Sequence, residues 1–200
     1  MSKRHPTVRA QGGAAAVPAH GGAAAVTDDV QRRLRVGAAA AAVCLLWAAS
    51  AWTAGHLHAD PALHTVALFL HLVALVVGLG AVLAIDYYGL LWLLGRRTLR
   101  QVVDFTTPLH VPVWGGLAGL VLSGVMLEPD LSSGLTQVKL GLVLLIALNG
   151  VYASTLHRRL TAYGDRRPPA PLLTRGAASA LVSQAGWWGA VLIGFYNTRH

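Results

Sequence analysis

Five apolar stretches, each close to twenty residues long, dominate the chain after residue 35. They run over about 36–54, 62–85, 108–127, 137–156 and 177–196. A helix of about 20 apolar residues spans the roughly 30 Å hydrocarbon core of a bilayer. Lipid offers backbone groups no hydrogen-bond partner, and none of the stretches alternates as the strands of a membrane barrel do. The sequence therefore predicts an all-α polytopic membrane bundle of five transmembrane helices.

The composition supports this prediction. Only 12% of the residues are charged, whereas 54% are hydrophobic; an average soluble domain is about 25% charged. A net charge of +8 could suggest nucleic acid as a partner, but the basic residues lie in short segments between apolar runs, without interleaved aromatic residues. We therefore expect a lipid bilayer around the chain and no nucleic acid. The single cysteine, Cys44, cannot form an intrachain disulfide.

Lys and Arg gather in alternate connecting segments. Six precede the first span, three follow the second, and five separate the fourth from the fifth. Segments 55–61 and 128–136 hold none, and only Lys139 and Arg199 of the 16 basic residues fall on that side. The positive-inside rule predicts a cytoplasmic N-terminus and an outside C-terminus.

Residues 1–30 are rich in Ala and Gly, and GGAAAV occurs twice, at 12–17 and 21–26. Such a segment has little apolar area to offset the entropy lost on ordering. We expect a disordered cytoplasmic tail over 1–30 and a transmembrane domain over 31–200.

Small residues recur at four-residue spacing in two spans. The rows are Gly115, Gly119 and Ser123, and Gly186, Ala190 and Gly194. Such rows let helix backbones approach closely. We favour packing within the chain, and a homodimer seam is the alternative.

Two uncharged polar residues lie deep in the spans. Asn149 and Gln184 both fall roughly 10–12 Å from the inner boundary at helical rise. Equal depth would permit a hydrogen bond between their helices. Structural packing is the default interpretation, and a polar lining for a solute is the alternative.

His71 is the most unusual residue, because it lies about ten residues into the second apolar stretch. An ionisable side chain at that depth is a functional hypothesis by default. At 100° per residue His64, His71 and Gly78 share one face, with Asp86 nearby. We expect this stripe to face the bundle, with His71 as a cofactor ligand or as a neutral histidine bonded to a neighbouring helix.

A second histidine group lies in the first outer loop. His56, His58 and His64, near Asp60, could together bind Cu²⁺ or Zn²⁺. An ordinary polar loop is the alternative.

Asp86 and His110 both fall at the inner boundary, where a carboxylate–imidazole contact would neutralise either group. Proton transfer is the functional interpretation of such a pair, and an interfacial structural pair is the other. A haem clamped between His71 and His110 is disfavoured, because their depths differ by more than about 10 Å.

Lys139 opens the fourth apolar stretch. It could snorkel to the surface, or turn inward to the level of His71 as a fixed positive charge.

One histidine lies in an early helix and one lysine at the start of a later helix, within the segments LHTVALFLHLVALVVGLGAVLAIDYY, VWGGLAGLVLSGVML and LTQVKLGLVLLIALNGVYA. Over about residues 62–156 this layout resembles the membrane-bound protoporphyrinogen oxidase family and the copper-resistance D-like proteins.

The resemblance implies a bacterial-type inner (plasma) membrane, with His71 as a haem ligand and Lys139 as a catalytic residue. The leading hypothesis is a membrane protein that binds haem b, or a copper or zinc ion, and is distantly oxidase-like. One alternative is a small transporter that uses Asp86, His110 and Asn149 on an unknown small molecule. Another is a non-catalytic subunit of a membrane complex.

Overall fold

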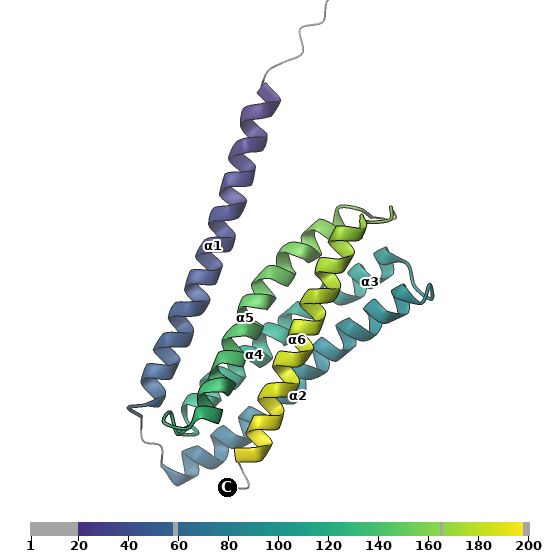
Figure 1. The fold of residues 1–200 in the computed structure, drawn as a ribbon. Helices are drawn as coiled ribbons and strands as arrows, with labels where there is room; N and C mark the ends of the chain where they lie inside the picture. The colour runs from purple at the N-terminus through teal and green to yellow at the C-terminus, as the bar shows by residue number, and fades with distance from the viewer. Residues whose placement is uncertain (1–19, 58–59, 165, 198–200) are drawn as a thin grey trace, which may run out of the picture. The chain divides into compact units, whose positions relative to one another are not determined.

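The structure is a computed structural model that describes residues 20–57, 60–164 and 166–197, with side chains from residue 27 onward. Within these ranges the chain forms helices only, which confirms the all-α prediction (Figure 1). The six helices are α1 (His20–Ala54), α2 (Pro61–Leu93), α3 (Leu99–Thr106), α4 (His110–Val125), α5 (Gly134–Thr161) and α6 (Ala170–Asn197).

Four helices are long and apolar enough to cross a membrane: Thr27–Ala54 of α1, α2, α5 and α6. Helix α4 has 16 residues, about 24 Å at helical rise, which is short of a bilayer core. It becomes a fifth candidate span only together with α3, from which it is bent by 42°. The chain is thus a polytopic membrane protein with four spans, or five with the bent pair.

Several helices extend beyond the apolar stretches predicted as spans. Helix α2 continues past residue 85 to Leu93 and is followed by Gly95 at a φ of +70°. Helix α3 was not predicted, and a capping box between Thr98 and Gln101 begins it. Helix α6 begins at Ala170 rather than near 177, and tolerates Pro171 in its first turn.

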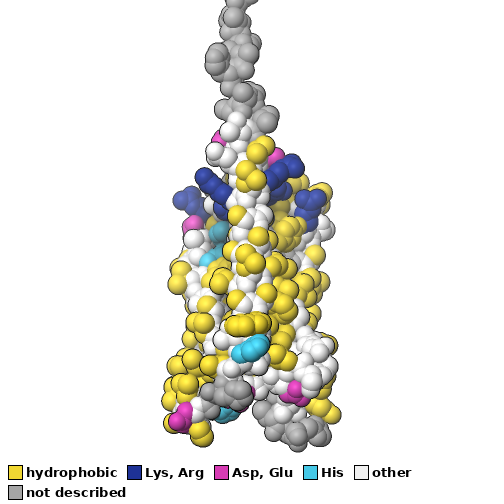
Figure 2. All heavy atoms as spheres, turned by 90° about the vertical axis from the view of Figure 1, so that its left-hand side faces the viewer, with side chains coloured by type: hydrophobic (Ala, Val, Ile, Leu, Met, Phe, Trp, Pro, Cys, Tyr) yellow, Lys and Arg dark blue, Asp and Glu magenta, His cyan; other side chains and the backbone are white. Residues whose placement is uncertain are grey.

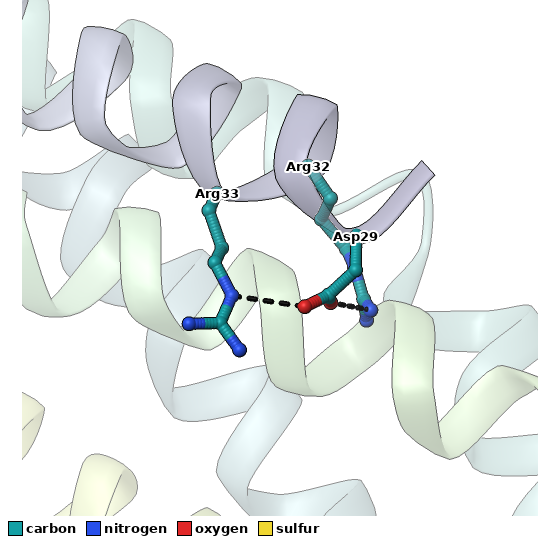
Figure 3. Close-up of polar contacts among 3 residues, drawn as sticks. All are labelled: Asp29, Arg32 and Arg33. Carbon is teal, nitrogen blue, oxygen red and sulfur yellow. Dashed lines mark hydrogen bonds and ion pairs between the residues drawn. The ribbon is translucent and has the colours of Figure 1, made fainter. Parts of the chain in front are cut away.

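The first 19 residues of the predicted tail lie outside the described residues, so their predicted disorder stays a prediction. Residues 20–30, expected in the same tail, belong instead to α1. Alanine has the highest helix propensity, and Asp29 forms ion pairs with Arg32 and Arg33 one turn away (Figure 3). All three side chains come from one helix, so this interaction is local to the segment that ends at Arg35.

Apolar side chains cover the sides of the bundle formed after residue 35. Phe69, Val76, Val111 and Leu192 are each at least 64% exposed. Figure 2 shows hydrophobic side chains along the helices. A soluble protein would bury such residues, whereas a lipid environment solvates them.

Helices α2 and α4 approach most closely where glycines face each other. A Cβ atom placed on Gly116 would lie 2.5 Å from Gly78 Cα and 2.8 Å from the carbonyl oxygen of Ala74. One placed on Gly119 would lie 2.9 Å from Ala74 Cβ. The predicted row was therefore partly wrong, because Gly116 rather than Gly115 faces the neighbouring helix.

Packing within the chain accounts for the second row as well. A Cβ atom on Gly186 of α6 would lie 2.7 Å from Ile146 Cγ1 of α5. Trp187, only 2% exposed, fills the core beside Gly78. Its neighbours in the core are Val82, Leu117, Ile146 and Ala147.

Candidate functional site

His71 faces the bundle and bonds to a neighbouring helix, as one interpretation of the sequence predicted. Its Nδ1 lies 2.9 Å from Ser123 Oγ, near the end of α4. The ring also lies beside Gly124, where an added Cβ would be 3.6 Å from Cε1. The absence of a side chain at residue 124 leaves the imidazole room against α4.

The hydrogen bonds of Ser123 determine which nitrogen of His71 carries the proton. The Ser123 hydroxyl donates to Gly119 O at 2.5 Å, so its oxygen is left to accept from His71 Nδ1–H. The other nitrogen, Nε2, then holds a lone pair. In histidines that bind metal ions, the ring nitrogen away from the metal is typically held by such a hydrogen bond, as His71 Nδ1 is here.

Lys139 turns inward rather than away from the bundle. Its Nζ lies beside Gly194 of α6, where an added Cβ would be 3.7 Å away. Among the described residues no oxygen accepts a hydrogen bond from Lys139.

The predicted Asp86–His110 pair does not form. Asp86 Oδ2 instead accepts a hydrogen bond from Gln184 Nε2 at 2.5 Å. Gln184 Oε1 accepts from Trp188 Nε1 at 2.9 Å, and because indole nitrogen can only donate, this contact fixes the orientation of the amide. Helix α2 continues beyond Asp86, which places the carboxyl against α6 instead of near the start of α4.

The predicted Asn149–Gln184 bond was also wrong, although Asn149 does bond to α6. Its Nδ2 donates to Ser179 O at 2.9 Å, and Ser179 Oγ donates to Asn149 Oδ1 at 3.0 Å. The Asn149 amide is thus hydrogen-bonded to Ser179, which precedes Gln184 on α6 by more than one helical turn. Both of its polar atoms are used in helix packing, which supports the structural interpretation of Asn149.

His110 meets another histidine instead of Asp86. Its ring lies 4.7 Å from that of His157, with an angle of 59° between the planes. The sequence analysis assigned no partner to His157, so it missed this pair. Sequence spacing carries no signal for it, because the two residues lie on different helices.

The outer-loop histidines are only partly described. His56 Nδ1 lies 2.8 Å from Trp52 O, and its ring stacks on Trp52. Asp60 accepts a hydrogen bond from Ala62 N as the cap of α2, and His58 lies outside the described residues. Within the ranges that the structure covers, no three His, Cys, Asp or Glu side chains come together to hold a metal ion. The three-histidine site at His56, His58 and His64 stays a prediction.

In the other outer loop, Asp130 accepts hydrogen bonds from the Ser132 hydroxyl at 2.6 Å and from the Ser132 backbone N–H at 2.9 Å. These bonds hold the pKa of the Asp130 carboxyl below its usual range, and the bond from the Ser132 hydroxyl has the largest effect. They order the loop between α4 and α5.

Comparison with known proteins finds no match: neither a family model, nor a curated protein, nor a solved structure is similar to this chain. The oxidase-like resemblance therefore stays a prediction, and the functional argument depends on the geometry around His71.

Proposed function

We propose that this polytopic membrane protein binds a cofactor through His71 Nε2, with haem b as the first candidate and a copper or zinc ion as the alternative. The observation that supports the proposal is the His71–Ser123 hydrogen bond, which leaves Nε2 with its lone pair. Imidazole with that protonation is the form that binds haem iron and transition metals. A bound haem would supply one-electron chemistry.

Lys139 is the second residue of the proposed site. A cation without an acceptor inside a membrane span is costly unless an anion is near. Haem propionates are such anions, and the ammonium group lies beside Gly194 inside the bundle. In this proposal Lys139 holds the anionic edge of the cofactor, and it is also the candidate catalytic residue if the protein is oxidase-like.

The proposed orientation follows from charge. Arginines flank the α2–α3 turn and the α5–α6 connection, whereas the 128–136 segment has no Lys or Arg. We propose that the arginine-rich end faces the cytoplasm of a bacterial-type cell. The His71 site would then lie in the outer half of the inner membrane.

The transporter alternative has weaker support. Asp86, His110 and Asn149 were its candidate residues, and each is hydrogen-bonded to a different part of the bundle. No described contact joins any two of them into a path. A non-catalytic membrane subunit remains the third candidate.

The test is an absorption spectrum and metal analysis of the full chain, purified in detergent after expression with haem and metals supplied. We expect a Soret band, or stoichiometric metal, in the wild type and its loss in His71→Ala. Ser154→Ala, which removes a hydroxyl bonded to Gly150 O of its own helix, is the control and should keep the cofactor. Wild-type protein without haem or metal would refute the proposal.

A further inference from the structure

We infer that His110 and His157 form a second site, which binds a single divalent transition-metal ion of the Zn²⁺ or Cu²⁺ type at the arginine-rich end of the bundle. His110 is the first residue of α4, and His157 lies in the last turns of α5. Their ring centroids are 4.7 Å apart. The inference does not depend on the cofactor proposed for His71.

Hydrogen bonds leave one nitrogen of each ring as a free ligand. Thr107 Oγ1–H donates to Val103 O at 2.7 Å, so Thr107 Oγ1 accepts from His157 Nε2–H at 3.1 Å. His110 Nδ1 lies 3.1 Å from Thr106 O and 3.3 Å from Thr107 O, two acceptors that require Nδ1 to carry the proton. His110 Nε2 and His157 Nδ1 therefore hold lone pairs, and no described residue is hydrogen-bonded to them.

This arrangement matches the support that histidine ligands receive in metal sites. There the N–H that does not face the metal donates to a carbonyl or another acceptor, which orients the ring. Here backbone carbonyls orient His110, and a threonine that is itself fixed by a carbonyl orients His157. Both rings are thus oriented before any ion binds.

The ring separation fits two imidazoles on one ion. With Zn–N bonds of about 2.0–2.1 Å, each ring centroid lies about 3.2 Å from the metal, so a tetrahedral angle separates the centroids by about 5 Å. Two imidazoles on opposite faces of a haem would be separated by about 6 Å, by the same arithmetic with similar bonds. The observed 4.7 Å favours a small ion over a haem between these rings.

Two protein ligands leave the remaining coordination positions to water. The Thr107–His157 contact lies at an exposed position, so water can reach the ion. Arg158 and Arg159, which follow His157 and are exposed, oppose a bound cation. We therefore expect weaker binding than in a closed four-ligand site, and tighter binding at high salt, where these charges are screened.

The experiment titrates metal-free full-length protein in detergent with Co²⁺, read by its visible absorption, and with Zn²⁺ in competition with a chromophoric chelator. We expect one binding equivalent that His110→Gln and His157→Gln each remove, with no further loss in the double variant. Ser154→Ala, whose hydroxyl bonds to Gly150 O of its own helix, is the control and should keep this equivalent. His71→Gln should also keep it while losing any ion bound at the His71 site, so the two sites are recognised separately. Unchanged Zn²⁺ binding in both single variants would overturn the inference.

If a variant does not fold, wild-type protein loaded with one equivalent of Zn²⁺ provides the second measurement. X-ray absorption at the zinc edge counts the imidazole ligands. Two imidazoles with oxygen ligands support the site. No imidazole, or three, contradicts it.

Discussion

His71 Nδ1 lies 2.9 Å from Ser123 Oγ, while the same hydroxyl donates to Gly119 O of its own helix. One serine thus joins α2 to α4 and selects the protonation of the imidazole. The free Nε2 that results is the chemical basis of the proposed cofactor site.

Ser123→Ala should weaken cofactor binding about 10- to 100-fold, the usual effect of removing the partner that orients a metal-binding histidine. It should also lower the stability of the cofactor-free protein by about 1 kcal/mol, because one hydrogen bond between helices is lost. Cofactor titration and thermal unfolding in detergent measure the two effects. Ser154→Ala is the control, since Ser154 bonds only to Gly150 O of its own helix. Equal effects of the two changes would contradict this role of Ser123.

Gly116→Ala should destabilise the bundle by about 1–3 kcal/mol, the typical cost of overpacking. The added methyl group would lie 2.5 Å from Gly78 Cα, and backbone atoms cannot move aside without separating α2 from α4. Gly115→Ala is the matched control, because nothing lies within 4 Å of a Cβ there. Thermal unfolding of both variants checks the prediction, and a stable Gly116→Ala protein would show that the two backbones do not meet here.

Asp86→Asn and Gln184→Leu should have non-additive effects on stability, because the two side chains share a hydrogen bond. The coupling energy should be about 0.6–1.7 kcal/mol, the range found for such bonds between membrane helices. A double-mutant cycle with Asp86→Asn and His110→Gln is the comparison, and its energies should add. Coupling to His110 instead would restore the pair that the sequence suggested.

Trp187→Phe should be tolerated. The indole Nε1 is buried without a hydrogen-bond partner in the part of the chain that the structure describes, so its loss removes no bond. Trp187→Ala should instead cost about 3–5 kcal/mol, because the side chain is the largest in the core. Unfolding midpoints of the two variants test the contrast, and a large loss in Trp187→Phe would reveal an unrecognised partner of the indole.

Cysteines at positions 58 and 132 should react with an impermeant thiol reagent in intact cells, whereas cysteines at Arg97 and Arg158 should not. The expectation follows from the positive-inside rule, because the arginine-rich connections remain in the cytoplasm. Each variant carries Cys44→Ser, which removes the chain's own thiol. Labelling at 97 and 158 alone would reverse the proposed orientation.

The close approach of α2 and α4 could be anticipated only in part. The sequence showed that small residues recur in the span that contains Gly116, but the predicted row began at Gly115. One position along a helix is a rotation of about 100°. Neighbouring helices determine that rotation, so a pattern within one helix cannot fix it to one residue.

The sequence by itself determined that the chain is an all-α membrane protein, because span length and apolarity are properties of single segments. It also singled out His71, because ionisable residues are rare at such depth, and Lys139, because it is one of only two basic residues on its predicted side of the membrane. The partners of the polar side chains were decided only by the tertiary structure: Asp86 bonds to Gln184, and His110 lies against His157. Depth counted along a helix fixes one coordinate of a side chain. Its direction around the helix, and the helix that it meets, depend on how all the spans pack together.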